Sequence, residues 1–129
     1  MSRKEALMNK LTSSSLKYNE IQNELFNFNS LQEIAQKNVK RHEYEIELVV
    51  QNTKGNDGKK LYTNESQRKA AIHKIKDNND LYQDYLKEYT DVTNKIRKCV
   101  MELDILKFQQ RNNLKLVQLE LSMEEVKNE

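Results

Sequence analysis

Residues 80–106, "DLYQDYLKEYTDVTNKIRKCVMELDIL", carry an apolar side chain at alternating steps of three and four residues. This spacing is typical of a helix with one apolar face, as in a coiled coil. The ladder consists of Tyr82, Tyr85, Tyr89, Val92, Ile96, Cys99, Leu103 and Leu106. It predicts a long helix over 80–126, preceded by a break and a cap at "DNND", residues 77–80.

Beyond residue 106 we expect the ladder to continue with one extra step of four residues, a stutter that locally unwinds a left-handed supercoil. The expected positions are Gln110, Leu114, Val117 and Leu121.

The first half of the chain carries a matching ladder, which predicts a helix over 3–53. Only Ser14, Gln32 and His42 interrupt it, and we interpret His42 as a tolerated residue of the seam. The apolar members are Leu7, Leu11, Tyr18, Ile21, Leu25, Phe28, Ala35, Val39, Ile46 and Val49. The two ladders together predict an all-α fold in which two long helices pack antiparallel.

A competing interpretation concerns "YEIELVV", residues 44–50, where apolar and acidic residues alternate as they do in a half-buried strand. A short hairpin would then run through "GNDG" to "KKLYT". We prefer the helix, because a lone two-stranded hairpin is only marginally stable in water. The segment 54–64 is then a basic loop, and a short helix over 65–76 follows it. Thr63 or Asn64 would cap that helix, with Gln67 at capping-box spacing from Asn64.

The composition is that of a long-helix protein: 129 residues, 36% hydrophobic, 33% charged and no proline. We expect one all-helical domain over 1–129. The mean hydropathy of −0.96 and the absence of a long apolar run predict no membrane span and no signal peptide, so we expect a cytoplasmic protein. The single cysteine, Cys99, lies on the apolar ladder, which favours a buried side chain over redox chemistry.

The positive charge is concentrated in one segment. Residues 54–76, "KGNDGKKLYTNESQRKAAIHKIK", hold seven basic and two acidic residues, whereas 77–129 hold eight and eleven. Residues 1–36 hold four basic and four acidic residues, and residues 37–53 hold three of each. The whole positive excess therefore lies in residues 54–76. This segment also contains both glycines, Gly55 and Gly58, which we interpret as a flexible turn.

Clustered cations beside a glycine turn suit the phosphates of nucleic acid, and an aromatic ring among them could stack on a base. The candidate nucleic-acid-binding residues are Lys54, Lys59, Lys60, Tyr62, Arg68, Lys69, Lys74 and Lys76. The alternative is a solvated connector whose charges only keep the chain soluble. Composition does not decide between these two, but repetition of the segment around an oligomer would favour binding.

No residue pattern supports an enzyme, a metal site or a cofactor. Gly58 and Lys59 lack the second glycine and the Ser or Thr of a phosphate-binding loop. The acidic residues between Asp77 and Asp91 are better explained as carboxylates near a helix N-terminus, where they oppose the macrodipole. His42 and His73 have no Cys or His at ligand spacing.

A second apolar ladder lies late in the helix over 80–126 and points about 180° away from the first. A two-helix hairpin covers only one of these faces, so we expect the other to be a homo-oligomer interface. Its residues are Met101, Ile105, Phe108, Leu116, Leu119 and Met123. The full fold prediction is therefore a long antiparallel helical hairpin or coiled coil, with a short intervening helix, that assembles into a helical oligomer.

The stretch from residue 58 to 117 resembles the UvsY-type recombination-mediator family, small helical proteins encoded beside recombination genes of phages and mobile elements. The shared pattern is a Gly-Lys loop, a Thr-Asn-Glu cap, a short helix, an Asp-rich break before a Tyr, and a long helix that closes with Arg then Leu. The matching residues are Gly58, Lys59, Lys60, Leu61, Thr63, Glu65, Asp77, Asp80, Tyr82, Leu103, Arg111 and Leu114.

The resemblance implies a non-enzymatic, ring-forming helical protein of a bacteriophage or mobile element, acting in the host cytoplasm. Such a protein binds single-stranded DNA and helps a recombinase to displace a single-strand binding protein. It places the DNA contacts at Lys59, Lys60, Arg68 and Lys69, and less firmly at Lys74 and Lys76. The alternative hypothesis is a coiled-coil scaffolding protein that binds only other proteins.

Overall fold

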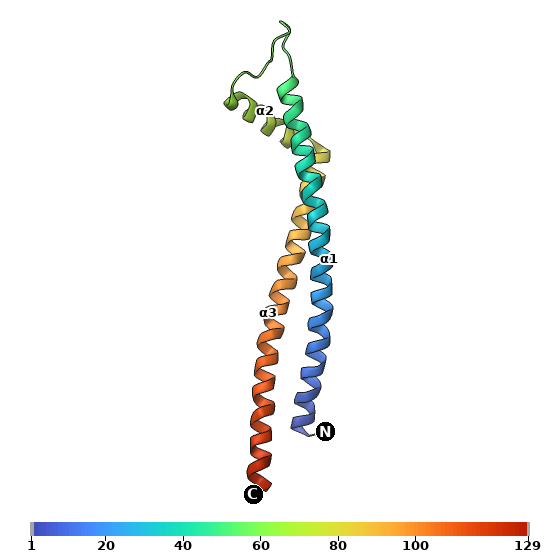
Figure 1. Cartoon of the computed structure of the whole chain (residues 1–129), viewed down its shortest axis with the longest axis vertical. Coiled ribbons are helices and arrows are strands. Elements are labelled where there is room, and N and C mark those ends of the chain that lie inside the picture. Colours follow the sequence, from blue (N-terminus) through green and yellow to red (C-terminus); the bar gives the residue numbers. More distant parts are fainter. Residues whose placement is uncertain (1, 129) are drawn as a thin grey trace. The chain divides into compact units, whose positions relative to one another are not determined.

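The computed structural model describes residues 2–128 and, over these residues, consists of three helices (Figure 1). Helix α1 spans Arg3–Asn52, α2 spans Glu65–Asn78 and α3 spans Asp80–Asn128. The two long helices pack antiparallel, and the short α2 lies between them in the chain. The prediction of an all-α fold with two long antiparallel helices is confirmed.

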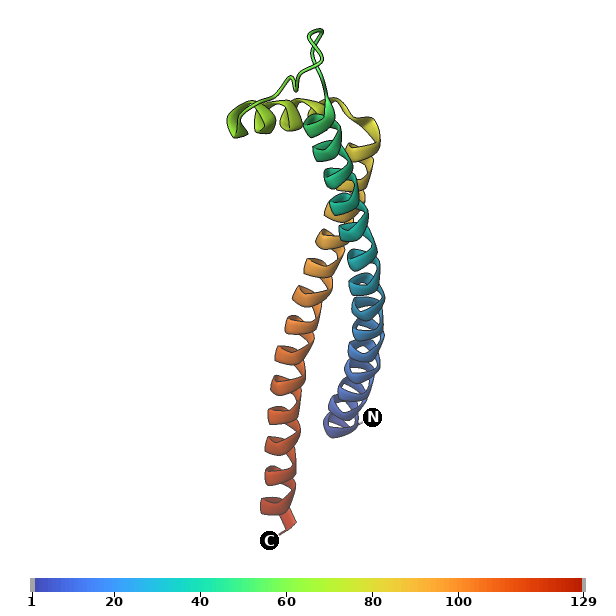
Figure 2. The ribbon, with the colours of Figure 1, turned by 45° about the horizontal axis from the view of Figure 1, so that its top comes forward.

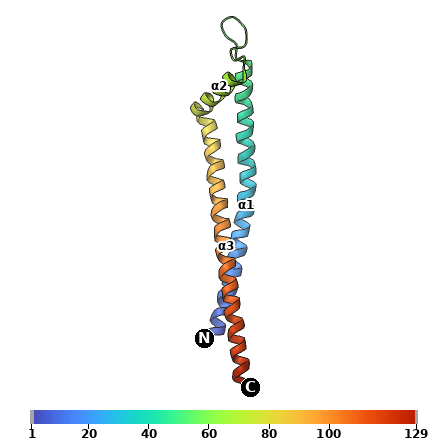
Figure 3. The same ribbon diagram turned by 90° about the vertical axis from the view of Figure 1, so that its left-hand side faces the viewer.

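The chain forms two compact units. The central unit, Ser30–Asn94, contains the end of α1, the loop, α2 and the start of α3. The terminal unit contains the described residues before Ser30 and those from Lys95 onward. Within the central unit, α2 crosses the end of α1 at a steep angle (Figure 2), and the loop that precedes α2 projects beyond α1 (Figure 3).

The core of the terminal unit is formed by the ladder residues of both helices. Ile21 of α1 packs against Cys99, Leu103 and Leu106 of α3, and all four are buried. Partly buried hydrophobic side chains surround this cluster, namely Tyr18, Leu25 and Phe28. Burial of each large apolar side chain stabilises the pairing by about 1.5–3 kcal/mol. Packing of the two helices therefore contributes more to their stability than the modest intrinsic helix preference of the sequence.

The core of the central unit adds α2 to the same two helices. Val39, Ile46 and Tyr82 are buried, and Ile72 and Ile75 of α2 pack against them. Further along α3, the partly buried side chains are Tyr85, Leu86 and Tyr89. The apolar face of α2 is thus used to close the end of the helix pair.

Polar residues of the α1 ladder make specific contacts inside the central unit. The amide of Gln32 donates to the Thr93 hydroxyl at 3.0 Å. The half-buried His42 ring stacks on Tyr82 at a centroid distance of 6.3 Å and meets Tyr85 edge-on at 5.6 Å. The prediction that His42 is a seam residue is confirmed, and its stacking explains how the seam accepts it.

The predicted ladder is wrong at its last position in α1. Val49 is 58% exposed, whereas Val50 is 1% exposed and fully buried. The step from Ile46 is therefore four residues instead of three. A straight helix has 3.6 residues per turn and drifts by about 20° per heptad against a 3.5-residue repeat, so a four-residue step restores the inward direction.

The predicted stutter in α3 is also wrong. Leu114 and Leu121 are 49% and 41% exposed, while Asn113 and Glu120 are half-buried and Val117 is buried between them. The inner positions thus keep the regular steps 106, 110, 113 and 117, and Glu120 follows at the edge of this inner face. Polar contacts hold this register, because Gln110 donates to the Ser15 hydroxyl at 3.2 Å and Glu120 pairs with Arg3 at 3.2 Å.

The competing strand interpretation of residues 44–50 is wrong, since α1 continues through them to Asn52. It ends one residue before the predicted limit, whereas α2 and α3 each extend two residues beyond theirs. Among residues 2–128, β pairing is found in the loop, as an antiparallel bridge between Lys54 and Lys60.

The ends of α2 and α3 follow from capping side chains. The Asn64 side chain accepts from the Gln67 amide at 2.8 Å, and the Gln67 side chain accepts in return from the Thr63 amide at 3.1 Å. Asn79 ends α2 and caps α3 by accepting from the Tyr82 amide at 2.9 Å. Each such cap is worth about 1 kcal/mol.

Candidate nucleic-acid interface

The loop after α1 is a small hairpin closed by its own backbone. The Leu61 amide donates to the Thr53 carbonyl at 3.0 Å, and the Gly55 amide donates to the Lys59 carbonyl at 2.8 Å. Between them, the Gly58 amide donates to the Gly55 carbonyl at 3.0 Å and forms the turn. We call residues 53–61 the basic hairpin.

The turn of the basic hairpin is determined by its sequence, "NDG". Gly58 has a φ of 75°, in the left-handed region that glycine adopts without steric cost. A three-residue turn ending in such a residue is a common hairpin connection. The Asp57 carboxylate also accepts from the Lys59 amide at 3.0 Å. The turn predicted at the two glycines is therefore present, with a defined set of hydrogen bonds.

The basic hairpin holds two lysines directly opposite each other. The bonds from residue 55 to 59 and from 61 to 53 flank Lys54 and Lys60, which makes them a non-hydrogen-bonded pair. Cα atoms in such pairs lie about 4.5 Å apart and their side chains share one face. Like charges placed in this way are destabilising. An anion bound between them would remove that repulsion.

Lys54, Lys59 and Lys60 are exposed. Among residues 2–128, none of the three forms an ion pair. Tyr62 is half-buried and directly follows the hairpin, after the exposed Leu61. The cations that sequence analysis assigned to the loop are thus close together and available to a ligand.

The predicted cations of α2 are arranged differently. Lys69 pairs with Glu65 at 3.0 Å, and Arg68 is half-buried. Lys74 is exposed but follows Lys69 by five residues, which places the two about 140° apart around the helix. These three side chains therefore do not form one basic face.

Lys76 contacts residues of the other two helices. Its ammonium lies 3.8 Å from the Glu43 carboxylate and 5.5 Å from the centre of the Tyr82 ring, and its side chain is 25% exposed. The Tyr82 hydroxyl donates to the same carboxylate at 3.1 Å. Burial, together with this bond and the charge of Glu43, raises the pKa of Tyr82. Lys76 thus connects α2 to α1.

The charge of the central unit limits how a polyanion would be attracted. Residues 30–94 contain eleven Lys or Arg and eleven Asp or Glu, so the unit is formally neutral. Long-range steering needs a net field of one sign. Binding at the basic hairpin would therefore depend on short-range contacts.

The second predicted site is on α3 in the terminal unit. The six residues predicted for the oligomer interface are all exposed, from Leu116 at 36% to Met101 at 65%. We call this face the outer stripe; it comprises Met101, Ile105, Phe108, Leu116, Leu119 and Met123.

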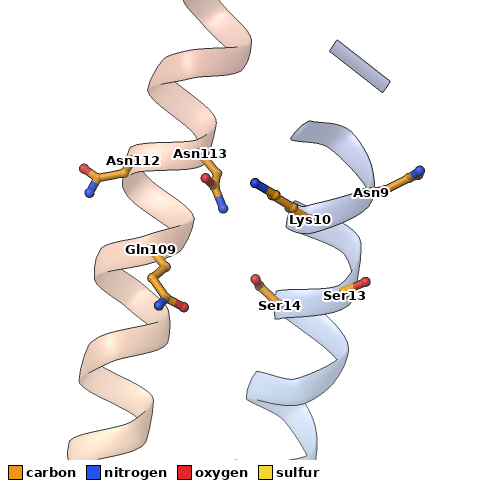
Figure 4. A pocket seen from close by; sticks show the side chains of 7 residues that line it. All are labelled: Asn9, Lys10, Ser13, Ser14, Gln109, Asn112 and Asn113. Atoms are coloured by element: carbon orange, nitrogen blue, oxygen red, sulfur yellow. The ribbon is translucent and has the colours of Figure 1, made fainter. Parts of the chain in front are cut away.

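A polar groove that no sequence pattern signals lies between the helices of the terminal unit. It has a volume of about 570 Å³ and opens to solvent. Lys10 and Asn113 extend toward one another across it, whereas Asn112 points away from α1 (Figure 4). Its lining is formed by Asn9, Lys10, Ser13, Ser14, Gln109, Asn112 and Asn113. The lining side chains are amides, hydroxyls and the Lys10 ammonium.

Within residues 2–128, no group of three or more His, Cys, Asp or Glu side chains is placed to bind a metal ion. The helices described here also include none with the length and hydropathy needed to cross a membrane. Comparison of the chain with protein-family models, with curated proteins and with solved structures finds no match.

Proposed function

We propose that this protein is a non-enzymatic recombination mediator, which binds single-stranded DNA through the basic hairpin and helps to load a recombinase. The observation that supports this most is the opposed pair Lys54 and Lys60. The hairpin backbone places two unpaired cations side by side. Their repulsion raises the free energy of the folded hairpin unless an anion lies between them.

The neighbouring residues extend the same argument. Lys59 adds a third cation, and Tyr62 provides a ring on which a base can stack, a contact worth about 1–3 kcal/mol. Bases are accessible for stacking in a single strand but not in a duplex, which favours single-stranded DNA. The cations hold phosphates without distinguishing sequences. The resemblance to UvsY-type mediators supplies the biological setting of the proposal.

The basic residues of α2 are not equally available for contacts with DNA. Arg68, Lys69 and Lys74 remain candidate contacts, of which Lys69 would have to share its charge with Glu65. Lys76 is better assigned to the Glu43 contact. The salt dependence of binding separates these cases. Three phosphate contacts predict a slope of log K against log salt of about −2, and six predict about −4.

The sharpest test is the substitution Lys54→Glu. It replaces a repulsive cross-strand pair with an attractive one, so the hairpin should be as stable as before or slightly more stable. Affinity for a labelled oligo-dT should nevertheless fall at least tenfold at low salt. Lys40→Glu is the matched control, because it changes an exposed lysine of the same unit by the same charge. Equal losses in both variants would contradict a site at the hairpin.

A second candidate function is favoured by the outer stripe. An exposed apolar face of this length is typical of a protein-binding surface, so the chain could be a scaffolding protein that contacts only proteins. In the mediator proposal the same face joins copies into a homo-oligomer. Absence of oligo-dT binding at low salt would exclude the mediator and leave the scaffold.

A further inference from the structure

The outer stripe has a regular spacing with one polar residue at its centre. Its members before residue 112 and after it are separated by the same steps, four and three residues on each side. The central position is taken by Asn112, which points away from α1 (Figure 4). A single Asn on such a seam is known to fix the register of paired helices, because its amide needs an opposite amide.

We propose that the outer stripe pairs with the same stripe of a second copy, parallel and in register. This inference specifies the self-association that the proposed function assigns to α3. In this register Asn112 faces Asn112 of the second copy, and each amide can donate to the other. A shift by one turn would bury the amide against Leu116 or Phe108 without a partner, which costs about 1–3 kcal/mol.

The apolar spacing alone does not determine the orientation. The stripe is symmetric about residue 112, so an antiparallel pair also matches apolar positions and again places the two Asn112 amides opposite each other. In that pair Ile105 would contact Leu119 of the second copy. The orientation must therefore follow from the charged residues beside the stripe.

The flanking charges favour the parallel pair. Parallel helices bring each residue on one flank near the residue five positions later on the other flank of the partner helix. These contacts are Arg97 with Glu102 and Lys115 with Glu120, both of opposite charge. Glu120 already pairs with Arg3 through Oε1, which leaves Oε2 for Lys115.

The antiparallel pair brings together like charges instead. In that orientation each flank meets the same flank of the second copy. Glu102 would then lie near Glu120, and Arg111 near Lys115. Each contact occurs twice by symmetry, and like charges at these positions oppose association. Lys98 lies seven residues before Ile105, so a parallel pair brings it near Lys98 of the second copy at the end of the stripe, a single repulsion that the flanking attractive contacts outweigh.

Disulfide trapping distinguishes the two orientations. In a Cys99→Ala background, Ile105→Cys and Leu119→Cys are prepared separately, oxidised mildly without DNA and analysed on non-reducing gels. The parallel pair brings each cysteine next to its own copy, within the Cα separation of about 4.4–6.8 Å that a disulfide needs. Each variant alone should therefore form covalent dimers. Lys17→Cys, exposed on α1, is the control and should stay monomeric on the gel.

The opposite pattern would overturn the proposal. An antiparallel pair predicts no cross-link in either variant alone and a covalent heterodimer only when the two are mixed. Asn112→Cys should cross-link in both orientations, so its failure to do so would show that the stripe does not pair with itself. Circular dichroism confirms that each variant keeps its helix content. Because no DNA is present, this outcome is independent of the test of the basic hairpin.

Discussion

Replacement of Val50 by alanine tests the register of α1 directly, because its neighbour Val49 provides a matched control. Val50 is 1% exposed and Val49 is 58% exposed, although both are valines in the same helical turn. The apolar ladder of the sequence places Val49 inside, and the structure places Val50 there. The two substitutions remove the same atoms and differ only in burial.

The expected magnitude follows from the buried atoms. The loss of two buried methyl groups costs about 1.6 kcal/mol in transfer free energy. The cavity left behind adds up to about 1 kcal/mol. The higher helix propensity of alanine offsets about 0.5 kcal/mol. Val50→Ala should therefore lower the free energy of unfolding by about 2 kcal/mol, whereas Val49→Ala should leave it unchanged or raise it by about 0.5 kcal/mol.

Urea unfolding followed by circular dichroism at 222 nm measures this difference. With a slope of about 2 kcal/mol per M, the midpoint of Val50→Ala should lie about 1 M below that of the wild type. All proteins are compared at one concentration, because self-association would stabilise the folded state by mass action. A larger loss for Val49→Ala than for Val50→Ala would refute the four-residue step after Ile46.

Three further predictions concern single groups. Burial, aided by Glu24 and Glu102, raises the pKa of the Cys99 thiol, so its reaction with Ellman's reagent should be slow in the native protein and fast in guanidinium. Because the folded pKa of Tyr82 is raised above its ordinary value of 10.0, its contribution to stability is complete below that pH and is lost as the pH rises through the folded value. The stability of the wild type relative to Tyr82→Phe should therefore fall above pH 10, and parallel urea titrations would reveal an unchanged difference if this is wrong. Gly58→Ala places a Cβ in open space at a φ of 75°, so its cost of about 1 kcal/mol is backbone strain alone and should speed hydrogen exchange at the Gly55 amide, with Lys40→Ala as control.

The spacing of apolar residues predicted most of the helix pairing, because residues at steps of three and four fall on one face of a helix and are buried together. Ile21, Val39, Leu103 and Leu106 are buried as expected. The failures at Val49 and Leu114 have different causes. At Val49 the 3.6-residue turn requires a step of four after Ile46, whereas Leu114 is an apolar residue outside the inner face, because the repeat says nothing about the opposite helix. The contact of Gln110 with Ser15 joins residues 95 positions apart, and no local pattern signals it.

The candidate site was predictable to the same extent. Charge counting located the cations, but the opposition of Lys54 and Lys60 depends on the turn register that Gly58 sets. Lys76 pairs with Glu43, a residue of another helix, and this contact cannot be read from the local sequence. Net charge along a sequence therefore identifies a basic segment without showing which of its cations are available.

Formal neutrality of the central unit makes association of copies important for the proposed function. Three phosphate contacts release only about two counterions per copy, so one basic hairpin would bind a single strand weakly at physiological salt. The remaining affinity must come from linked sites, because joining copies turns later contacts into intramolecular ones. The outer stripe provides a surface that can join them. Around Asn112 the exposed face of α3 carries more apolar side chains than the inner face carries around Gln110 and Asn113. On this argument the apolar stripe and the basic hairpin, although they lie in different units, serve one activity.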